Sequence, residues 1–206
     1  CPHMGVIDHL TGDILVYEPR AQDEILSDNV IASRQVHRAD LHKLLATSLI
    51  DKNNCLKLDY KLQDITQDTD QVKLSFANGQ VDYCDIVIGA DGLKSAVRER
   101  LYSSEPANFT GFVAWRGLVD RSLVQNISLD PHFATYSSSD KLFVRYPVRN
   151  GDLLNYVAIA RKDDFLSESW AEPAEVSEVA AQFSDWHQDV SDIILATPVD
   201  KCMRWA

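Results

Sequence analysis

Asp-Ile-Val-Ile-Gly-Ala-Asp-Gly-Leu-Lys-Ser-Ala-Val-Arg, residues 85–98, is the stretch that decides the fold class of this chain. The apolar run Ile86–Ile88 ends in Gly89-Ala90-Asp91-Gly92, and a helical pattern follows over residues 94–101. In α/β folds a buried strand that stops at glycines and leads into a helix brings the backbone close to a phosphate group. Glycine permits that approach because it has no Cβ. The stretch therefore predicts a nucleotide-binding turn, although an ordinary strand-turn-helix unit would show the same spacing.

Composition narrows the choice of partners. The chain has 206 residues, enough for one domain or two small ones, and a formal net charge of -11. This charge argues against nucleic acid and anionic membrane surfaces as partners, but it leaves room for a small anionic substrate in a local positive pocket. No stretch approaches the roughly 20 apolar residues of a membrane helix. The cysteines have no metal-site spacing, which predicts no metal centre and reduced thiols in the cytoplasm: Cys1, Cys55, Cys84 and Cys202.

The first half of the chain has the pattern of an α/β unit. Two strands are expected within residues 5–17, on either side of a turn at 11–13. Apolar residues at helical spacing predict a helix over 36–50. Further strands are expected at 55–62 and 71–77, and Asn78-Gly79 after the second is a hairpin signal.

The second half is rich in strand-forming residues. Four apolar runs between 109 and 160 are separated by turn residues, which predicts an antiparallel sheet. Residues 175–196 have a helical pattern that ends before Pro198.

Two motifs in the first half carry a resemblance to a known family. The Asp91-Gly92 stretch resembles the Asp-Gly motif of the FAD-dependent aromatic hydroxylases, which include salicylate and hydroxybenzoate hydroxylases. In that family the motif lies near the FAD pyrophosphate, so the resemblance implies cofactor binding by Asp91, Gly92 and Arg98. Residues 36–41 resemble the family's Val-His-Arg-x-x-Leu helix start, whose arginine contacts FAD, which implies the same role for Arg38. An arginine at a helix start opposes the helix dipole, and an anionic ligand would offset this cost; an ordinary surface arginine is the alternative.

The β-rich half resembles the substrate side of the same family. Residues 111–118 resemble its entering strand, and we assign Arg116 no catalytic role. Residues 146–149 and 154–157 resemble the paired strands beneath the flavin and the substrate, which implies a pocket lined by Leu142, Tyr146, Pro147 and Asn155.

Two details of this pocket can be anticipated. Pro147 is expected at an edge or bulge because it cannot donate to a ladder. Many family members have, where this chain has Leu142, a histidine that acts as the base toward the substrate hydroxyl. His132 is then the catalytic candidate, with a surface or core histidine as the competing interpretation.

The resemblance implies a mixed α/β fold with two interleaved lobes. A partial Rossmann-like FAD lobe would cover residues 30–102. An antiparallel-sheet substrate lobe would cover 1–29 and 103–195, and 196–206 would return to the FAD lobe. The family's Gly-x-Gly-x-x-Gly fingerprint and its later Gly-Asp segment are absent from the sequence. We therefore expect an internal fragment that by itself neither holds FAD tightly nor catalyses the reaction.

The activity implied by the resemblance is that of a flavoprotein monooxygenase of aromatic catabolism. NAD(P)H would reduce FAD, and a flavin C4a-hydroperoxide formed with O₂ would hydroxylate a small aromatic substrate. The resemblance leaves a homodimer of the full-length protein open. Two alternatives remain: another nucleotide-dependent α/β enzyme such as a methyltransferase, and a non-catalytic binding domain derived from the flavoprotein fold. A parallel sheet in the β-rich half would favour the methyltransferase.

Overall fold

The computed structural model describes residues 3–19, 34–50, 55–102, 105, 108–162 and 172–205. These residues form two compact units, which are considered separately. Unit 1 consists of Cys1–Leu41 and Phe109–Ala206, and unit 2 of His42–Asn108. The division falls inside helix α2 (Arg38–Ile50), where the sequence predicted a helix over 36–50. The lobe boundaries inferred from the sequence stay predictions.

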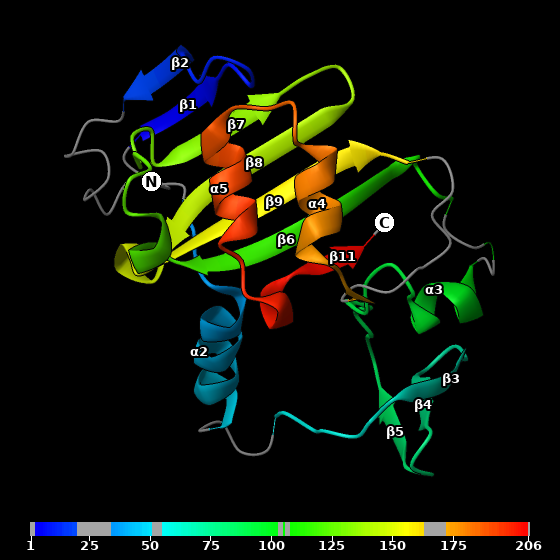
Figure 1. Ribbon diagram of the computed structural model, residues 1–206. Coiled ribbons are helices and arrows are strands. Elements are labelled where there is room, and N and C mark those ends of the chain that lie inside the picture. Colours follow the sequence, from blue (N-terminus) through cyan, green and yellow to red (C-terminus); the bar gives the residue numbers. More distant parts are fainter. Residues whose placement is uncertain are drawn as a thin grey trace. The chain divides into compact units, whose positions relative to one another are not determined.

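Unit 1 is built on an eight-stranded sheet with the order β10-β11-β6-β9-β8-β7-β1-β2 (Figure 1). All neighbours pair antiparallel except β1 and β7, which are parallel. The strands are β1 (His3–Ile7), β2 (Ile14–Pro19), β6 (Phe112–Asp120), β7 (Phe133–Ser137), β8 (Lys141–Val148), β9 (Leu153–Arg161), β10 (Glu172–Pro173) and β11 (Met203–Trp205).

The four strands predicted within residues 109–160 are confirmed, and they form the antiparallel order β6-β9-β8-β7. This arrangement speaks against the methyltransferase alternative, which called for a parallel sheet here. The parallel pair makes the whole sheet mixed rather than antiparallel. Because β1 and β7 lie far apart in the sequence, no short hairpin fixes their relative direction.

Two helices, α4 (Val176–Gln182) and α5 (Gln188–Leu195), cover one face of this sheet (Figure 1). Strand β9 shows the consequence, since every second residue from Leu154 to Ala160 is buried and the residues between them are partly exposed. The core beneath the helices is aromatic and aliphatic, and its largest buried side chains include Trp115, Phe143, Tyr156, Phe183 and Ile193.

The single helix predicted over 175–196 is wrong, because the chain breaks between Phe183 and His187. The amide of His187 donates to the carbonyl of His9 at 2.6 Å instead of continuing the helical ladder. The His187 ring then accepts from the amide of Asp189 at 3.3 Å and caps α5. A contact with a distant turn therefore overrides the local helical pattern.

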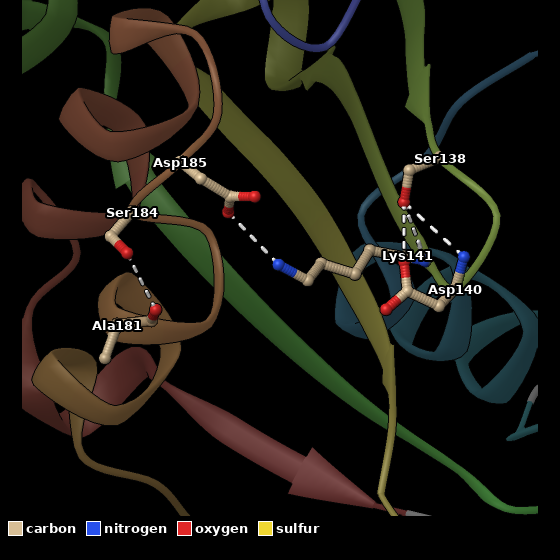
Figure 2. A network of polar contacts seen from close by, with 6 residues as sticks. All are labelled: Ser138, Asp140, Lys141, Ala181, Ser184 and Asp185. Atoms are coloured by element: carbon tan, nitrogen blue, oxygen red, sulfur yellow. Dashed lines mark hydrogen bonds and ion pairs between the residues drawn. The ribbon is translucent and has the colours of Figure 1, made fainter.

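Polar contacts join the β7–β8 turn to the corner between the two helices (Figure 2). The Nζ of Lys141 lies 3.1 Å from a carboxylate oxygen of Asp185. On the turn, the hydroxyl of Ser138 donates to Asp140 at 2.9 Å and accepts from the amide of Lys141 at 3.1 Å. The ion pair thus links the turn to the helical layer, while the buried core packs the helices on the sheet.

Unit 2 contains an antiparallel sheet of β3 (Leu62–Gln67), β4 (Val72–Phe76) and β5 (Val81–Cys84), together with helix α3 (Ala96–Leu101). The strand predicted at 71–77 and the Asn78-Gly79 hairpin are confirmed, and Gly79 has a φ of 82°. The strand predicted at 55–62 is wrong, since β3 begins only at Leu62. Asp59, with a φ of 62°, interrupts the extended backbone there.

The buried strand predicted at Ile86–Ile88 is also not observed. Ile86 is 79% exposed and Ile88 is 87% exposed, and no described strand pairs with them. With its large mixed sheet and its small antiparallel sheet, the architecture nevertheless confirms the predicted mixed α/β fold class. None of the helices in the described ranges has the length and apolarity to cross a membrane.

Candidate functional site

The turn that follows Ile88 is braced by the side chains that the sequence assigned to the cofactor. One carboxylate oxygen of Asp91 accepts from the amide of Val97 at 3.2 Å. A hydrogen bond with the Ser95 side chain, helped by amides at the start of α3, lowers the pKa of Asp91 below its usual value. Ser95 is the N-cap of α3, and its hydroxyl accepts from the amide of Arg98 at 3.0 Å.

Arg98 also contacts the backbone of this turn. Its Nη2 donates to the carbonyl of Leu93 at 2.6 Å. Gly92 has a φ of 79°, and no atom lies within 4 Å of the position that its Cβ would occupy. The structure thus brings Asp91, Gly92 and Arg98 together, with the two charged residues bracing the turn and the glycine facing open space. An open, glycine-containing turn fits the close approach of a phosphate-bearing group.

A cavity of about 480 Å³ lies beside this turn within unit 2. Its walls come from β3, β4, α3 and the segment after β5, and they include Ile65, Gln67, Val72, Asp85, Ile86, Val87, Gly89, Ser95, Val97, Arg98, Leu101 and Tyr102. A Cβ on Gly89 would lie 3.1 Å from Val97. Glycine at this position therefore lets α3 pack closely against the preceding segment.

Arg38 begins α2 in unit 1, and its side chain is exposed. Within the described ranges, its guanidinium has no hydrogen bond or ion pair with another residue. The amides of Asp40 and Leu41 both donate to the carbonyl of His37, which closes the first turn of the helix. Arg38 is therefore an available cation at a helix start, as the predicted role in anion binding requires.

Leu142, Tyr146 and Asn155 lie on the sheet face opposite the helices. That they line a substrate pocket stays a prediction. They alternate along β8 and β9 with the buried residues, and all three are partly exposed. Tyr146 is directly opposite Asn155 in the β8–β9 register. Its ring stacks on Phe133 of β7, with centroids 5.7 Å apart and an interplanar angle of 8°.

Pro147 is separated from this group. It pairs with Leu154, whose side chain is buried beneath the helices, so strand alternation directs Pro147 to the other face. The pairing of β7 with β8 ends at Arg145, so no β7 residue lies opposite Pro147. The missing amide hydrogen of the proline therefore leaves no β7 carbonyl without a donor. This arrangement satisfies the expectation that the proline occupies a local edge.

The sheet face opposite the helices, which carries Leu142, Tyr146 and Asn155, is called the open face below. Its chemistry is set by a few polar groups. Burial raises the pKa of Tyr146 above its ordinary value, so its hydroxyl is protonated at neutral pH. Arg116 lies on the same face, opposite Val157, and its guanidinium lies 5.6 Å from the ring centroid of Trp205. The open face can therefore pack against an aromatic ring and donate hydrogen bonds to the polar substituents of that ring.

His132 belongs to a different cluster. Its ring lies 6.1 Å from that of His3, which stacks on Tyr17, and the Tyr17 hydroxyl donates to Asp130 at 2.9 Å. Desolvation, followed by the proximity of His3, lowers the pKa of His132. Among the described residues, no hydrogen bond or ring contact joins His132 to Tyr146 or Asn155, and its role as a base stays a prediction.

Sequence reasoning missed a buried arginine in the middle of β8. Arg145 is 1% exposed, and its Nη1 donates to the carbonyl of Pro131 at 3.2 Å. It lies on the helix-covered face, between Phe143 and Pro147 along the strand. The period-2 pattern of β8 could have placed it there, because Phe143 two residues earlier is a core residue.

The comparisons with known proteins agree with this geometry. No family model matches the chain. The 6-hydroxynicotinate 3-monooxygenase of Bordetella bronchiseptica is 33% identical over 165 residues, which cover 79% of this chain and 42% of that protein. The salicylate hydroxylase of Pseudomonas putida is 28% identical over 175 residues, covering 76% of this chain and 40% of that enzyme.

A solved structure supports the fold. HpxO of Klebsiella pneumoniae, complexed with FAD and uric acid, superposes with a TM-score of 0.77 at 21% identity, covering 98% of this chain and 50% of that one. This chain thus spans about half, or somewhat less, of the length of the proteins that it matches. Over the part of their length that it spans, the chain is similar in sequence and in fold to the FAD-dependent aromatic hydroxylases.

Proposed function

We propose that the protein to which this chain belongs is an FAD-dependent monooxygenase that uses NAD(P)H and O₂ to hydroxylate a small aromatic substrate. The observation that carries the proposal is the open sheet face, where Leu142, Tyr146 and Asn155 lie together on a partly exposed and mainly apolar surface. Names of the relatives, such as 6-hydroxynicotinate 3-monooxygenase, support an aromatic substrate with ionisable oxygens. When bound, FAD supplies the redox chemistry, which protein side chains cannot perform.

The open face orients and shields the substrate. Leu142, Val144 and Val157 are neighbours in the β8–β9 register and provide an apolar wall that excludes water from the ring. Tyr146 is the hydrogen-bond donor, because its protonated hydroxyl has no hydrogen-bond partner among the described residues. Asn155 provides a second polar group beside it. Leu142 cannot take up a proton, so the substrate proton must pass to a group elsewhere.

The cofactor residues divide into two roles. Arg38 offers an exposed guanidinium to a phosphate, and Gly92 leaves space for the ligand to approach the backbone. Asp91 and Arg98 keep the turn in shape through Val97, Ser95 and Leu93. We propose that these two residues act mainly as braces for the turn.

The test uses the full-length protein. A flavin absorbance spectrum after purification, followed by NAD(P)H oxidation and product analysis with a panel of hydroxylated aromatic carboxylates, is expected to show bound FAD and substrate-stimulated turnover. A protein without flavin and without substrate-stimulated NAD(P)H consumption would refute the proposal. If that flavin-free protein still bound aromatics, the non-catalytic domain would replace it; Leu142 is the observation that favours this second candidate.

Two further expectations belong to the same proposal. Cys84 and Cys202 have free thiols, in keeping with the proposed cytoplasmic location. The homodimer stays a prediction that size measurements on the full-length protein would test.

A further inference from the structure

The hairpin between β8 and β9 contains three consecutive residues with positive φ. Arg149, Asn150 and Gly151 have φ values of 51°, 57° and 96°. Glycine adopts this conformation freely and asparagine tolerates it, whereas a long side chain such as arginine is strained. Arginine is therefore a costly choice at position 149 for the turn alone. Its side chain must supply something that the backbone does not need.

The Arg149 side chain binds Asp40 in the first turn of α2. The Nε of Arg149 donates to Oδ2 of Asp40 at 2.8 Å, and its Nη2 donates to Oδ1 at 2.8 Å. Two parallel bonds between a guanidinium and a carboxylate fix the direction of both groups as well as their distance. Asp40 Oδ2 also lies 3.7 Å from Nδ1 of His37. Residues 109 apart in the sequence are thus joined within unit 1.

Asp40 follows Arg38 by two positions in the helix. Successive helix residues are rotated by about 100°, so Arg38 projects from a different side of α2 than Asp40 does. With Asp40 held on the hairpin, Arg38 is directed away from it. The pair also neutralises a carboxylate that would otherwise weaken the attraction of Arg38 for a phosphate.

We propose that Arg149 is a positioning residue for the flavin. It fixes and neutralises Asp40, and the start of α2 then presents Arg38 to a phosphate of FAD. Through this contact the hairpin of the substrate-side sheet holds the first turn of α2, within unit 1. The inference rests on the proposed function, because it needs FAD as the ligand of Arg38.

The test is FAD titration of the flavin-free full-length protein, followed by flavin fluorescence. Arg149→Asn suits the positive φ and removes the pair, so we expect the Kd for FAD to rise roughly tenfold while the melting temperature is unchanged or higher. Arg149→Lys keeps the positive charge but loses the two parallel hydrogen bonds to Asp40. Its Kd for FAD should lie between those of the wild type and Arg149→Asn. Asp40→Asn combined with Arg149→Asn should recover part of the affinity, because the negative charge that Arg149 neutralised is gone. Lys201→Asn, which removes the exposed ion pair with Asp200, is the matched control and should bind FAD like the wild type.

Each outcome bears on one proposal. Wild-type FAD affinity in Arg149→Asn would overturn the positioning role and leave the monooxygenase proposal intact. Weaker binding that appears only together with a lower melting temperature would also overturn it, because it would assign the effect to the stability of the turn. Failure of the wild-type protein to bind FAD would instead refute the proposed function itself.

Discussion

Replacing Tyr146 with phenylalanine is the sharpest test of the open sheet face. The substitution removes one hydroxyl and keeps the ring, whose stacking on Phe133 at 5.7 Å does not depend on the oxygen. The hydroxyl has no hydrogen-bond partner among the described residues. Fold stability should therefore change little, and any loss of activity should come from the substrate.

The size of the effect follows from the charge state of the hydroxyl. Burial raises the pKa of Tyr146 above its ordinary value, so at neutral pH its hydroxyl can donate a hydrogen bond but cannot act as a base. A hydrogen bond to a charged oxygen contributes about 1.5–3 kcal/mol. Its loss should lower kcat/KM roughly 10- to 150-fold. The wild-type pH profile should show no inflection from Tyr146 below about pH 10, the ordinary tyrosine pKa.

The assay measures kcat and KM for the aromatic substrate in the full-length enzyme. Tyr156→Phe is the matched control, because Tyr156 belongs to the paired strand but is buried beneath the helices. Its oxygen accepts from the hydroxyl of Thr197 at 3.2 Å. The control should lose about 0.5–1.5 kcal/mol of unfolding free energy and keep its KM. If Tyr146→Phe retained kcat/KM within about twofold, below the smallest effect of a donated bond, the assignment of the open face to substrate would be wrong.

Three other perturbations test the fold and the turn. Gly117→Ala should cost about 1–3 kcal/mol in urea unfolding, because its Cβ would overlap the ring of Tyr156; a neutral result would contradict this packing. Phe143→Ala, in the fully buried core, should cost about 3–5 kcal/mol, and a loss below about 1 kcal/mol would show that the core is misplaced. The lowered pKa of Asp91 means that its bracing of α3 is complete above the usual carboxyl pKa and is lost as the pH falls through the lower folded value. Hydrogen exchange at the Val97 amide should accelerate in that acid range, after correction for intrinsic rates, and a flat profile would argue against the brace.

Local patterns predicted the elements whose causes lie within a few residues. The Asn78-Gly79 hairpin needs only two residues that tolerate its backbone angles, and its strand β4 was found with it. The four strands of the β-rich half were found because their apolar runs are separated by turn residues. Motif spacing also brought Asp91, Gly92 and Arg98 to one turn, although the bracing role of the two charged residues required coordinates.

Other features depend on partners far away in the sequence. The break before α5 exists because the amide of His187 donates to the carbonyl of His9. The residues around His187 in the sequence cannot reveal this contact, because His9 lies far away in the chain. The extended segment at 55–61 failed to become a strand, since β3 rather than this segment pairs with β4.

By itself, then, the sequence determined the mixed α/β class, most of the strands, and the family relationship, since these follow from periodicity and short motifs. Only the tertiary structure decided which sheet face α4 and α5 cover, and hence that Tyr146 and Asn155 remain partly exposed while Pro147 is turned away. It also decided that Arg149 meets Asp40. The physical reason is that covering one face of a sheet, or joining side chains more than a hundred residues apart, is settled by the packing of the whole unit and not by any local preference of the chain.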